Sequence, residues 1–298
     1  MNIKVTIGVI TYKSATFIKE TLDSCLLQLN NDFEIELFVS DDASQDGSKE
    51  IISAWMEEHG NKFCSHTFVA QPENLGGRNN SNFVLNNAQG EYIRTLEGDD
   101  ILVPRAVSKL VEYVDSDPKI NFVFSNLYVF YDDINQVSLE RATNSNFVCA
   151  NAKKQHEMLF ISMKANGPTT FYNRQLLIDI GGRVGTRNIG DLPTMLNITA
   201  HGYKLYCYEE PLLYYRRHSG NISSSKTNPK EWKKQRYEMK KFRNEMFFGP
   251  HLSFMLRIYC VYDLLKAKKS QEKLSFLEQM KLLCMRPIFT FYKKVKFG

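Results

Sequence analysis

Strand-like and helix-like segments alternate through the first half of this chain, and this alternation limits its fold more than any other feature of the sequence. Short runs rich in β-branched residues are separated by segments whose apolar residues recur with helical spacing. Such alternation is typical of βαβ units around a mostly parallel sheet. The predicted strands are Val5–Thr11, Phe33–Ser40, Phe63–Ala70 and Glu91–Leu96, and the predicted helices are Phe17–Leu29, Ser48–His59, Asn79–Asn87 and a segment that has Pro104 in its first turn and ends near Asp115.

The ends of these predicted strands are polar. Ligands of such sheets bind beside the carboxyl ends of the strands, where the sequence places Thr11-Tyr12, Asp41-Asp42, Gln71–Asn74 and Glu97–Asp100. In the last of these, three carboxylates fall within four residues and repel one another. A hard divalent cation, Mg²⁺ or Mn²⁺, would relieve that repulsion and share its other positions with water or substrate phosphates. A polar turn before a helix N-terminus is the alternative explanation.

The second half of the chain is less regular. We expect a strand at Ile120–Tyr131, a polar loop from there to Asn151, and a strand and short helix at Gly167–Tyr172 and Arg174–Ile180. Further on, the sequence predicts a helix at Asp191–His201, with Gly202 at its C-terminal cap, and two strands at Tyr203–Tyr208 and Leu212–Arg217 separated by Glu209-Glu210-Pro211.

From about residue 228 the composition changes, and we divide the chain into a sheet domain, 1–225, and a C-terminal helical region, 226–298. A charged helix begins near Lys230, the stretch Leu252–Leu265 is strongly apolar and aromatic, and the chain ends in lysines around Lys293–Lys296. Aromatic residues beside clustered lysines suit an interfacial helix on a membrane. A helical appendage packed on the sheet domain, or a contact in a homo-oligomer, is the alternative.

Composition excludes several classes of protein. The net charge of +5 is modest and both signs are mixed along most of the chain, which does not favour a nucleic-acid partner. Six scattered cysteines without a CxxC pair suit reduced thiols in a cytosolic protein. No signal peptide or membrane-spanning run is visible, so we expect a cytoplasmic protein, either free or peripheral at the inner face of the membrane. The absence of GxGxxG after the first strand argues against a dehydrogenase.

Several motifs occur in an order that resembles the inverting family 2 glycosyltransferases of the GT-A fold. The similarity covers about residues 3–225. Its motifs are Thr11–Ser14, Val39–Ser48, Asn74–Asn79, Gly90–Ile93 leading into the DxD-type Glu97–Asp100, Gly190-Asp191 and Tyr214–His218. The resemblance implies an α/β GT-A fold, a Rossmann-like mixed sheet flanked by helices, here with the C-terminal helices appended.

The resemblance also implies a metal site for Mn²⁺ or Mg²⁺. Asp99 is the candidate first ligand, and Glu97 and Asp100 would ligate directly, ligate through water, or orient the donor's ribose and sugar hydroxyls. His218 could ligate the cation or touch the donor diphosphate, with Arg216 or Arg217 beside it. Glu97 departs from the family pattern, because many relatives have aspartate at this position.

The remaining candidate residues would bind the donor nucleotide or take a proton. Thr11 and Tyr12 belong to the first nucleotide-contacting loop, and Asp41 and Asp42 would bind a pyrimidine N–H and ribose hydroxyls, in an order that stays open. Arg78 could reach diphosphate or base, although many relatives carry this arginine where the chain has Ser81. Gly190 stands where relatives have glutamate.

Asp191 is the candidate general base, because a positioned carboxylate can take the proton of an acceptor hydroxyl as the new bond forms. A helix N-cap is its alternative role.

The resemblance therefore predicts a glycosyltransferase that moves a sugar, most simply from a UDP-sugar, onto a saccharide or lipid-linked acceptor with inversion, in cell-surface polysaccharide biosynthesis. One alternative is a nucleotidyltransferase of similar fold, which the lack of glycine in Thr11–Ser14 disfavours. The other is a catalytically inactive binding scaffold, against which the retained Asp99, Asp100 and Asp191 count.

Overall fold

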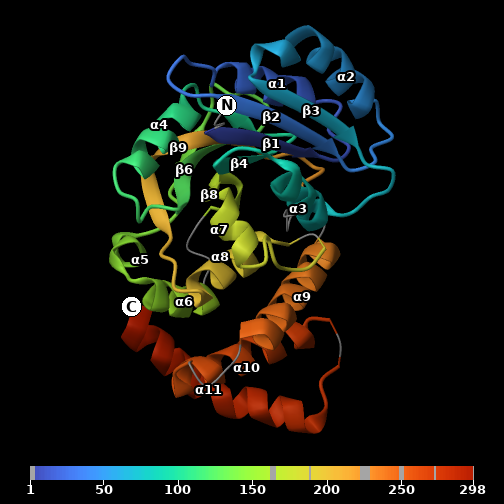
Figure 1. Ribbon diagram of the computed structural model, residues 1–298. Coiled ribbons are helices and arrows are strands. Elements are labelled where there is room, and N and C mark those ends of the chain that lie inside the picture. The colour runs from blue at the N-terminus through green and yellow to red at the C-terminus, as the bar shows by residue number, and fades with distance from the viewer. Residues whose placement is uncertain are drawn as a thin grey trace.

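The protein folds around one mixed β-sheet with helices on both faces (Figure 1), as seen in a computed structural model of the chain. The structure describes residues 4–161, 166–187, 189–221, 229–247, 252–271 and 273–297, without the side chains of residues 231, 232 and 288–297. Within these residues the sheet has nine strands, in the order β3-β2-β1-β4-β8-β6-β9-β5, with β7 paired to β6. The strands are β1 Val5–Thr11, β2 Ile35–Asp41, β3 Ser65–Ala70, β4 Tyr92–Glu97, β5 Ile101–Leu102, β6 Phe122–Phe130, β7 Ser138–Glu140, β8 Phe171–Asn173 and β9 Tyr206–Arg216.

The four N-terminal strands are parallel, as the alternation predicts, and their helices agree with the prediction to within a few residues. From β8 onward the sheet becomes mixed, because β8 is antiparallel to β4 and to β6. The helices are α1 Ile18–Leu26, α2 Ser48–His59, α3 Gly77–Asn87, α4 Ala106–Asp115, α5 Ser145–Cys149, α6 Ala152–Ile161, α7 Arg174–Asp179, α8 Asp191–Ala200, α9 Pro229–Phe247, α10 Phe254–Lys269 and α11 Phe276–Phe297, with short 3₁₀ turns at Gly60–Lys62 and Gly167–Thr169.

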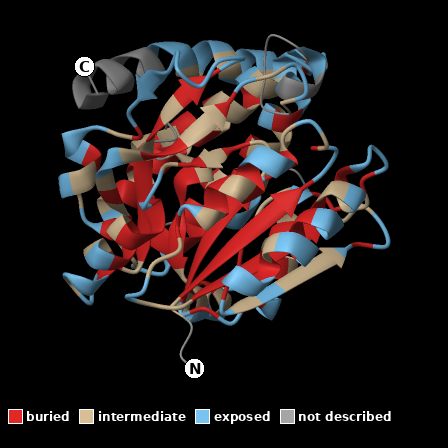
Figure 2. Ribbon diagram, turned by 90° about the horizontal axis from the view of Figure 1, so that it is seen from above, coloured by how far each residue is buried: buried red, intermediate tan, exposed pale blue. Residues whose placement is uncertain are grey.

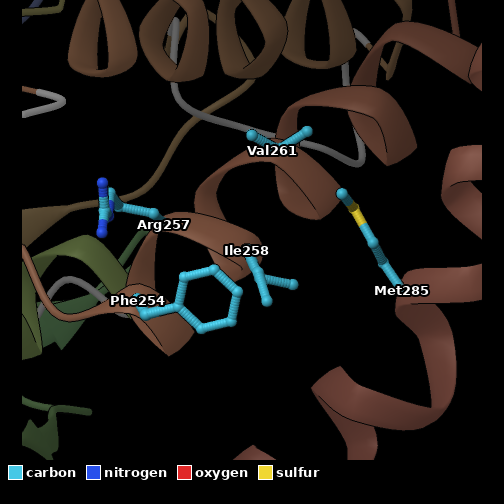
Figure 3. Close-up of a pocket in the computed structure, with 5 residues that line it drawn as sticks. All are labelled: Phe254, Arg257, Ile258, Val261 and Met285. Carbon is cyan, nitrogen blue, oxygen red and sulfur yellow. The ribbon is translucent and has the colours of Figure 1, made fainter.

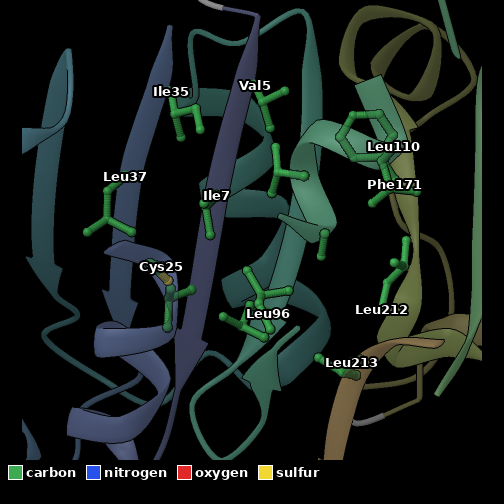
Figure 4. Packing of buried hydrophobic residues seen from close by; sticks show 14 of the residues in the cluster. Val5, Ile7, Cys25, Ile35, Leu37, Leu96, Leu110, Phe171, Leu212 and Leu213 are labelled. Atoms are coloured by element: carbon green, nitrogen blue, oxygen red, sulfur yellow. The ribbon is translucent and has the colours of Figure 1, made fainter. Parts of the chain in front are cut away.

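Two hydrophobic clusters lie on opposite faces of the sheet. Side chains of β1, β2 and β4 pack with α1, α2 and α4 in one cluster (Figure 4), while α3, α6, α8 and α10 contribute to the other. Figure 2 shows the resulting buried sheet between more exposed helices. Gly8 sits where α3 crosses β1, and a Cβ there would lie 2.8 Å from Val84 Cγ1, so this close packing depends on glycine.

Two predictions for the stretch between Pro104 and Asn151 are wrong in detail, and one helix beyond it was not predicted. The polar stretch to Asn151 is not only a loop, because it forms β7 and α5; β7 is fully exposed and gains its structure from pairing with β6, which leaves no apolar signal. Pro104 lies just before α4 rather than in its first turn. The sequence also gives no sign of α6, whose buried face includes Gln155, bonded to the carbonyls of Phe147 and Leu205.

The two strands predicted around Pro211 are one strand, β9. Its ladder with β6 changes register between Ser125 and Asn126, so that Tyr208 pairs with Ser125 and Pro211 with Asn126. Two residues of β9, Glu209 and Glu210, therefore bulge out, and the bulge accommodates a proline that lacks the N–H for a regular ladder. The Asn126 side chain stabilises the bulge by donating to the Glu209 carbonyl.

The first two C-terminal helices pack on the sheet domain. Arg243 of α9 donates to the Phe160 carbonyl over 2.6 Å, and Tyr259 of α10 donates to the Ile161 carbonyl over 3.0 Å. Most large apolar residues of the stretch Leu252–Leu265 are buried, among them Leu256 and Cys260. The division at residue 225 stays a prediction, and so does the membrane role of this stretch. Of the aromatic residues of α10, Tyr259 and Tyr262 are buried and Phe254 is 68% exposed. Within the described residues, no helix is both long and apolar enough to cross a membrane.

Candidate active site

The carboxyl ends of β1, β2 and β4 meet at one edge of the sheet. The ladder pairs Thr11 with Asp41 and Ile10 with Glu97, so the three strands end at the same level. The loops that leave β1 and β2 contain Lys13 and Ala43, which have φ of +55° and +63°. Non-glycine residues pay a steric penalty there, and such residues cluster where a loop geometry is needed for function. This edge gathers most of the predicted site residues.

Asp99 and His218 point at each other across this edge. Asp99 Oδ2 lies 2.9 Å from His218 Nε2, and the His218 ring rests on Phe17 with ring centroids 4.7 Å apart. The backbone N–H of Gly220 donates to His218 Nδ1 over 3.1 Å. His218 Nδ1 therefore accepts a hydrogen bond and Nε2 carries the ring proton. The Nε2–H group donates its hydrogen bond to Asp99 Oδ2. Two residues that are 119 positions apart in the sequence thus form one polar pair.

Asp100 and Arg216 stabilise the acidic turn, by which we mean Glu97–Asp100. Asp100 is fully buried; its Oδ1 accepts the Arg216 backbone N–H over 3.0 Å, and its Oδ2 has no partner among the described residues. Burial and the neighbouring Asp99 raise the pKa of Asp100 well above its ordinary value. The Arg216 guanidinium donates to the Asp99 carbonyl over 3.0 Å and pairs with Glu20, between the rings of Phe17 and Phe130. Arg216 therefore supports the acidic turn, and its guanidinium is already engaged.

Glu97 connects the acidic turn to the next part of the site. Its side chain is accessible to solvent, yet the surrounding protein desolvates the carboxyl group. This desolvation, with the charges of Asp99 and Asp191, raises the pKa of Glu97 to about 8. The electrostatic influence of Asp191 shows that both acidic groups act on one region.

Asp41 and Asp42 have different surroundings, although they are adjacent. Both oxygens of Asp42 accept backbone N–H groups, from Leu75 over 2.6 Å and from Gly76 over 2.9 Å. Burial nevertheless raises the pKa of Asp42. Asp41 Oδ1 accepts the Ser44 N–H over 2.9 Å, whereas Asp41 Oδ2 is buried without a partner among the described residues. Asp42 shapes the β3–α3 loop, and Asp41 keeps an acceptor unused.

Asp191 is the first residue of α8 and pairs with Arg183. Arg183 Nη2 donates to Asp191 Oδ1 over 2.6 Å. The N-cap of α8 is Gly190, so the expectation that Asp191 itself caps the helix is wrong. A Cβ on Gly167 would lie only 2.0 Å from Asp191 Oδ2, so the carboxylate rests directly against that glycine backbone. Asp191 is fixed on two sides and stays 37% exposed.

The other predicted residues lie around this edge with varied freedom. Thr11 is buried, and its hydroxyl has no partner among the described residues. Tyr12 is 45% exposed, and Arg217 is half exposed and pairs with Glu140 over 3.4 Å. Arg78 donates to the Thr186 carbonyl over 3.2 Å and lies beside Gly190, which places it near Asp191.

Two arginines in the site were missed by the sequence analysis. Arg94 of β4 is fully buried; it donates to the Pro168 carbonyl over 2.8 Å, while its Nε and Nη2 have no partner among the described residues. Burial lowers the pKa of Arg94 to about 10, which Asp100 opposes. A charged residue inside the apolar run Tyr92–Leu96 was a usable signal. Arg183 follows two glycines with positive φ and gave no comparable signal.

The residues present fit a divalent cation between Asp99 and His218. Asp99 Oδ2 and His218 Nε2 are joined by a hydrogen bond of 2.9 Å, and adjacent ligands of an octahedral ion lie at a similar separation of about 3 Å. The Asp99 carboxylate is the type of ligand that Mg²⁺ and Mn²⁺ prefer. No group of three or more histidine, cysteine or acidic residues with metal-site geometry occurs among the described residues, so other positions would fall to water and substrate.

Comparison with known proteins gives one family and several distant relatives. The family model described as "Glycosyl transferase family 2" matches residues 6–181. An uncharacterised protein of Mycobacterium tuberculosis is 33% identical over 42% of this chain, which covers 35% of that relative's own length. The Escherichia coli UDP-Glc:alpha-D-GlcNAc-diphosphoundecaprenol beta-1,3-glucosyltransferase WfaP is 25% identical over 74% of this chain and 80% of its own.

Solved structures share the fold. S. aureus TarS 1–349 in complex with UDP-GlcNAc aligns with a TM-score of 0.63, at 16% identity, over 95% of this chain and 79% of TarS. The mannosyltransferase PcManGT from Pyrobaculum calidifontis in complex with GDP-Man and Mn²⁺ aligns with a TM-score of 0.60, at 17% identity, over 99% and 88% of the two chains. These alignments confirm the predicted GT-A fold.

The contact between Gly167 and Asp191 gives a first testable prediction. In Gly167→Ala, the new methyl group would collide with Asp191, including its Cβ, so the carboxylate must turn away from Arg183. We expect a loss of about 1–3 kcal/mol in the free energy of unfolding, because the buried guanidinium loses its partner. Chemical denaturation measures the loss. Gly77→Ala is the control, since a Cβ there meets no atom within 4 Å and Gly77, like Gly167, has no positive φ. Unchanged stability of Gly167→Ala would contradict the contact.

Proposed function

The chain belongs to glycosyl transferase family 2, and from this premise we propose that it is a glycosyltransferase that moves a sugar from a nucleotide-diphosphate donor to a saccharide or lipid-linked acceptor. The observation that carries the proposal is the meeting of Asp41, the Asp99–His218 pair and Asp191 along one edge of the sheet. A UDP-sugar is the favoured donor, since the names of WfaP and the TarS complex contain UDP-Glc and UDP-GlcNAc. The name of WfaP also supports a lipid-linked acceptor and a role in surface-polysaccharide assembly.

The nucleotide would bind over β1 and β2. Asp41 keeps one buried carboxylate oxygen without a partner among the described residues, and the Thr11 hydroxyl is in the same condition. Buried polar atoms normally find a partner, so these two are matched to donors that a ligand brings. We assign Asp41 to the base N–H or a ribose hydroxyl and Asp42 to holding the loop at Leu75. Tyr12 would cover the base, and Arg78 would approach the diphosphate.

The diphosphate would lie near Asp99 and His218, where Mn²⁺ or Mg²⁺ would be held. The cation, when bound, supplies positive charge that stabilises the departing nucleoside diphosphate. Ligation through His218 Nε2 requires the proton to leave that nitrogen. If the proton moves to Nδ1, the bond from the Gly220 N–H must open. Glu97 and Asp100 would ligate the cation directly or through water, or orient the donor's hydroxyls. Arg217 is the more accessible of the two arginines for the donor.

Asp191 would take the proton of the acceptor. The acceptor oxygen forms a bond to the anomeric carbon as the bond from that carbon to the diphosphate breaks, and the hydroxyl proton passes to the Asp191 carboxylate. Attack from the face opposite the leaving group inverts the anomeric centre. Partial exposure of Asp191 leaves room for the hydroxyl.

Arg183 would orient that base. Its guanidinium is buried, holds Asp191 Oδ1 and lies within electrostatic reach of Glu97. The loop that carries Arg183 is itself fixed to α3, because the Asn82 side chain exchanges two hydrogen bonds of 2.8 Å with the Arg183 backbone. Arg183 thus holds one Asp191 oxygen and Gly167 packs against the other, while the side chain stays 37% exposed toward an acceptor.

The metal site is tested with Asp99→Ala. Loss of this carboxylate should lower the rate of transfer by about 10³-fold, since a bound cation contributes several kcal/mol and each 1.4 kcal/mol is a factor of ten. Calorimetry of UDP with and without Mn²⁺ should show that metal-dependent binding is lost. Asp32→Ala, in an exposed loop, is the matched control. Full activity of Asp99→Ala, or of the wild type in EDTA, would rule out the assignment.

The base is tested with Asp191→Asn, which keeps the shape of the side chain but cannot accept the proton. We expect UDP-sugar binding to persist while turnover falls by about 10²-fold or more. Release of UDP in the presence of acceptor measures turnover, and Asp179→Asn at the end of α7 is the control. Turnover near the wild-type value, with only stability changed, would leave Asp191 a structural role.

The positioning role of Arg183 predicts a loss of turnover without a loss of donor binding. Arg183→Gln removes the charged group that holds Asp191 Oδ1, so kcat should fall by about tenfold or more while the KM for the UDP-sugar stays near the wild-type value. Arg183→Lys keeps a charged donor and should recover part of kcat. A thermal melt of each variant separates loss of folding from loss of positioning. Equal kcat values for the folded wild type and the folded Gln variant would contradict this role.

A further inference from the structure

The strongest feature that the proposed reaction leaves unexplained is an exposed apolar face on α11. Phe276, Leu277, Met280 and Leu283 are exposed by 75%, 70%, 44% and 62%. Their spacing of one, four and seven residues places them on one side of the helix. The apolar side of a helix on a soluble protein usually faces the core. On α11 this side faces the solvent instead.

The other side of α11 is already used for packing on α10. Glu278 of α11 pairs with Lys268 of α10 over 2.8 Å, and Met285 faces an open groove of about 260 Å³ lined by Phe254, Arg257, Ile258 and Val261 of α10 (Figure 3). These contacts fix the rotation of α11. Because Glu278 and Met285 on one side of α11 contact α10, the apolar residues on the opposite side point away from α10.

Charge is distributed very unevenly along this chain. Residues 229–298 contain 17 lysines and arginines and six acidic residues, a net charge of +11, whereas residues 1–228 carry a net charge of −6. The exposed lysines near the apolar face include Lys273, three residues before Phe276, and Lys281, four residues after Leu277. Among the described residues, no carboxylate forms an ion pair with Lys273 or Lys281, whereas Lys268 is paired with Glu278.

We propose that the exposed face of α11, with the lysines around it, docks the protein on the surface of an anionic lipid membrane. Apolar side chains would enter the boundary between headgroups and acyl chains, and the lysines would lie against anionic headgroups. A second copy that paired its own α11 with this face would also cover the apolar residues, but it would bring the same positive charge against Lys273 and Lys281. Charge complementarity therefore favours the membrane. The sequence analysis placed this role on Leu252–Leu265 and on the lysines around Lys293–Lys296. Leu256 and Cys260 of the first stretch are buried, and the side chains of the lysines around Lys293–Lys296 lie outside the described residues.

The test is flotation of the full-length protein with vesicles, which needs neither donor nor acceptor. Wild-type protein should float with vesicles that contain phosphatidylglycerol, and should not float with pure phosphatidylcholine. Binding should weaken in 1 M NaCl, where charges are screened within about 3 Å. Failure of the wild type to float with the anionic vesicles would overturn the proposal. Because the assay measures no sugar transfer, its result is independent of the proposed reaction.

Matched variants locate the surface. Leu277→Glu/Leu283→Glu should lower vesicle binding by about tenfold or more. Leu27→Glu, at a 56% exposed leucine that follows α1, should bind as the wild type does. Lys273→Glu/Lys281→Glu should weaken binding, and Lys49→Glu/Lys119→Glu in the sheet domain should not. Equal flotation of the α11 variants and the wild type would contradict the assignment. A dimer that the Leu277/Leu283 variant disrupts, without flotation of the wild type, would assign this face to a second copy.

Discussion

Repulsion between carboxylates at one edge of the sheet is the constraint on which the rest of the site depends. Glu97, Asp99 and Asp100 follow a single strand, and Asp191 acts on the same region from another element. The fold balances this charge with arginines in fixed places: Arg94 within β4, Arg216 under the acidic turn and Arg183 against Asp191. Each arginine also bonds to backbone carbonyls or is held by its own backbone, so the positive groups are as rigid as the strands.

This balance remains incomplete, and the incompleteness is informative. Asp41 and Asp100 each keep a buried oxygen without a partner among the described residues, and so does the Thr11 hydroxyl. Unpaired buried acceptors cost free energy, about 1–3 kcal/mol each, and they persist where the site is organised for a ligand. The unpaired acceptors lie at the proposed nucleotide and metal positions, whereas Arg183 already pairs with the base. We infer that the base is organised before binding and that the donor half of the site is completed by its ligand.

Much of this arrangement was predictable from local patterns. The parallel strands, their helices and the polar strand ends follow from alternation of apolar residues. The family motifs assigned Asp99 and His218, which are far apart in sequence, to the surroundings of one candidate cation. The predictions that failed depend on long-range pairing. β7 exists because β6 is beside it, β9 tolerates Pro211 because Asn126 supports a bulge, and α6 buries the polar Gln155. Arg183 was missed for the same reason, because its role depends on its contacts with Asp191 and Asn82, which the sequence does not show.

The C-terminal helices show how the two proposals can be joined physically. α9 and α10 bond to the last residues of α6, and α6 packs against α8 through the pair of His156 with Thr199, 2.9 Å apart. α8 begins with Asp191. A continuous set of packed helices therefore runs from α11, which carries the proposed membrane face, to the proposed base. Because packed helices move little relative to one another, docking through α11 would fix the orientation of Asp191 with respect to the membrane. An acceptor sugar carried on a lipid would then meet Asp191 at a fixed distance from the membrane surface. A soluble acceptor would not require such positioning by the C-terminal helices.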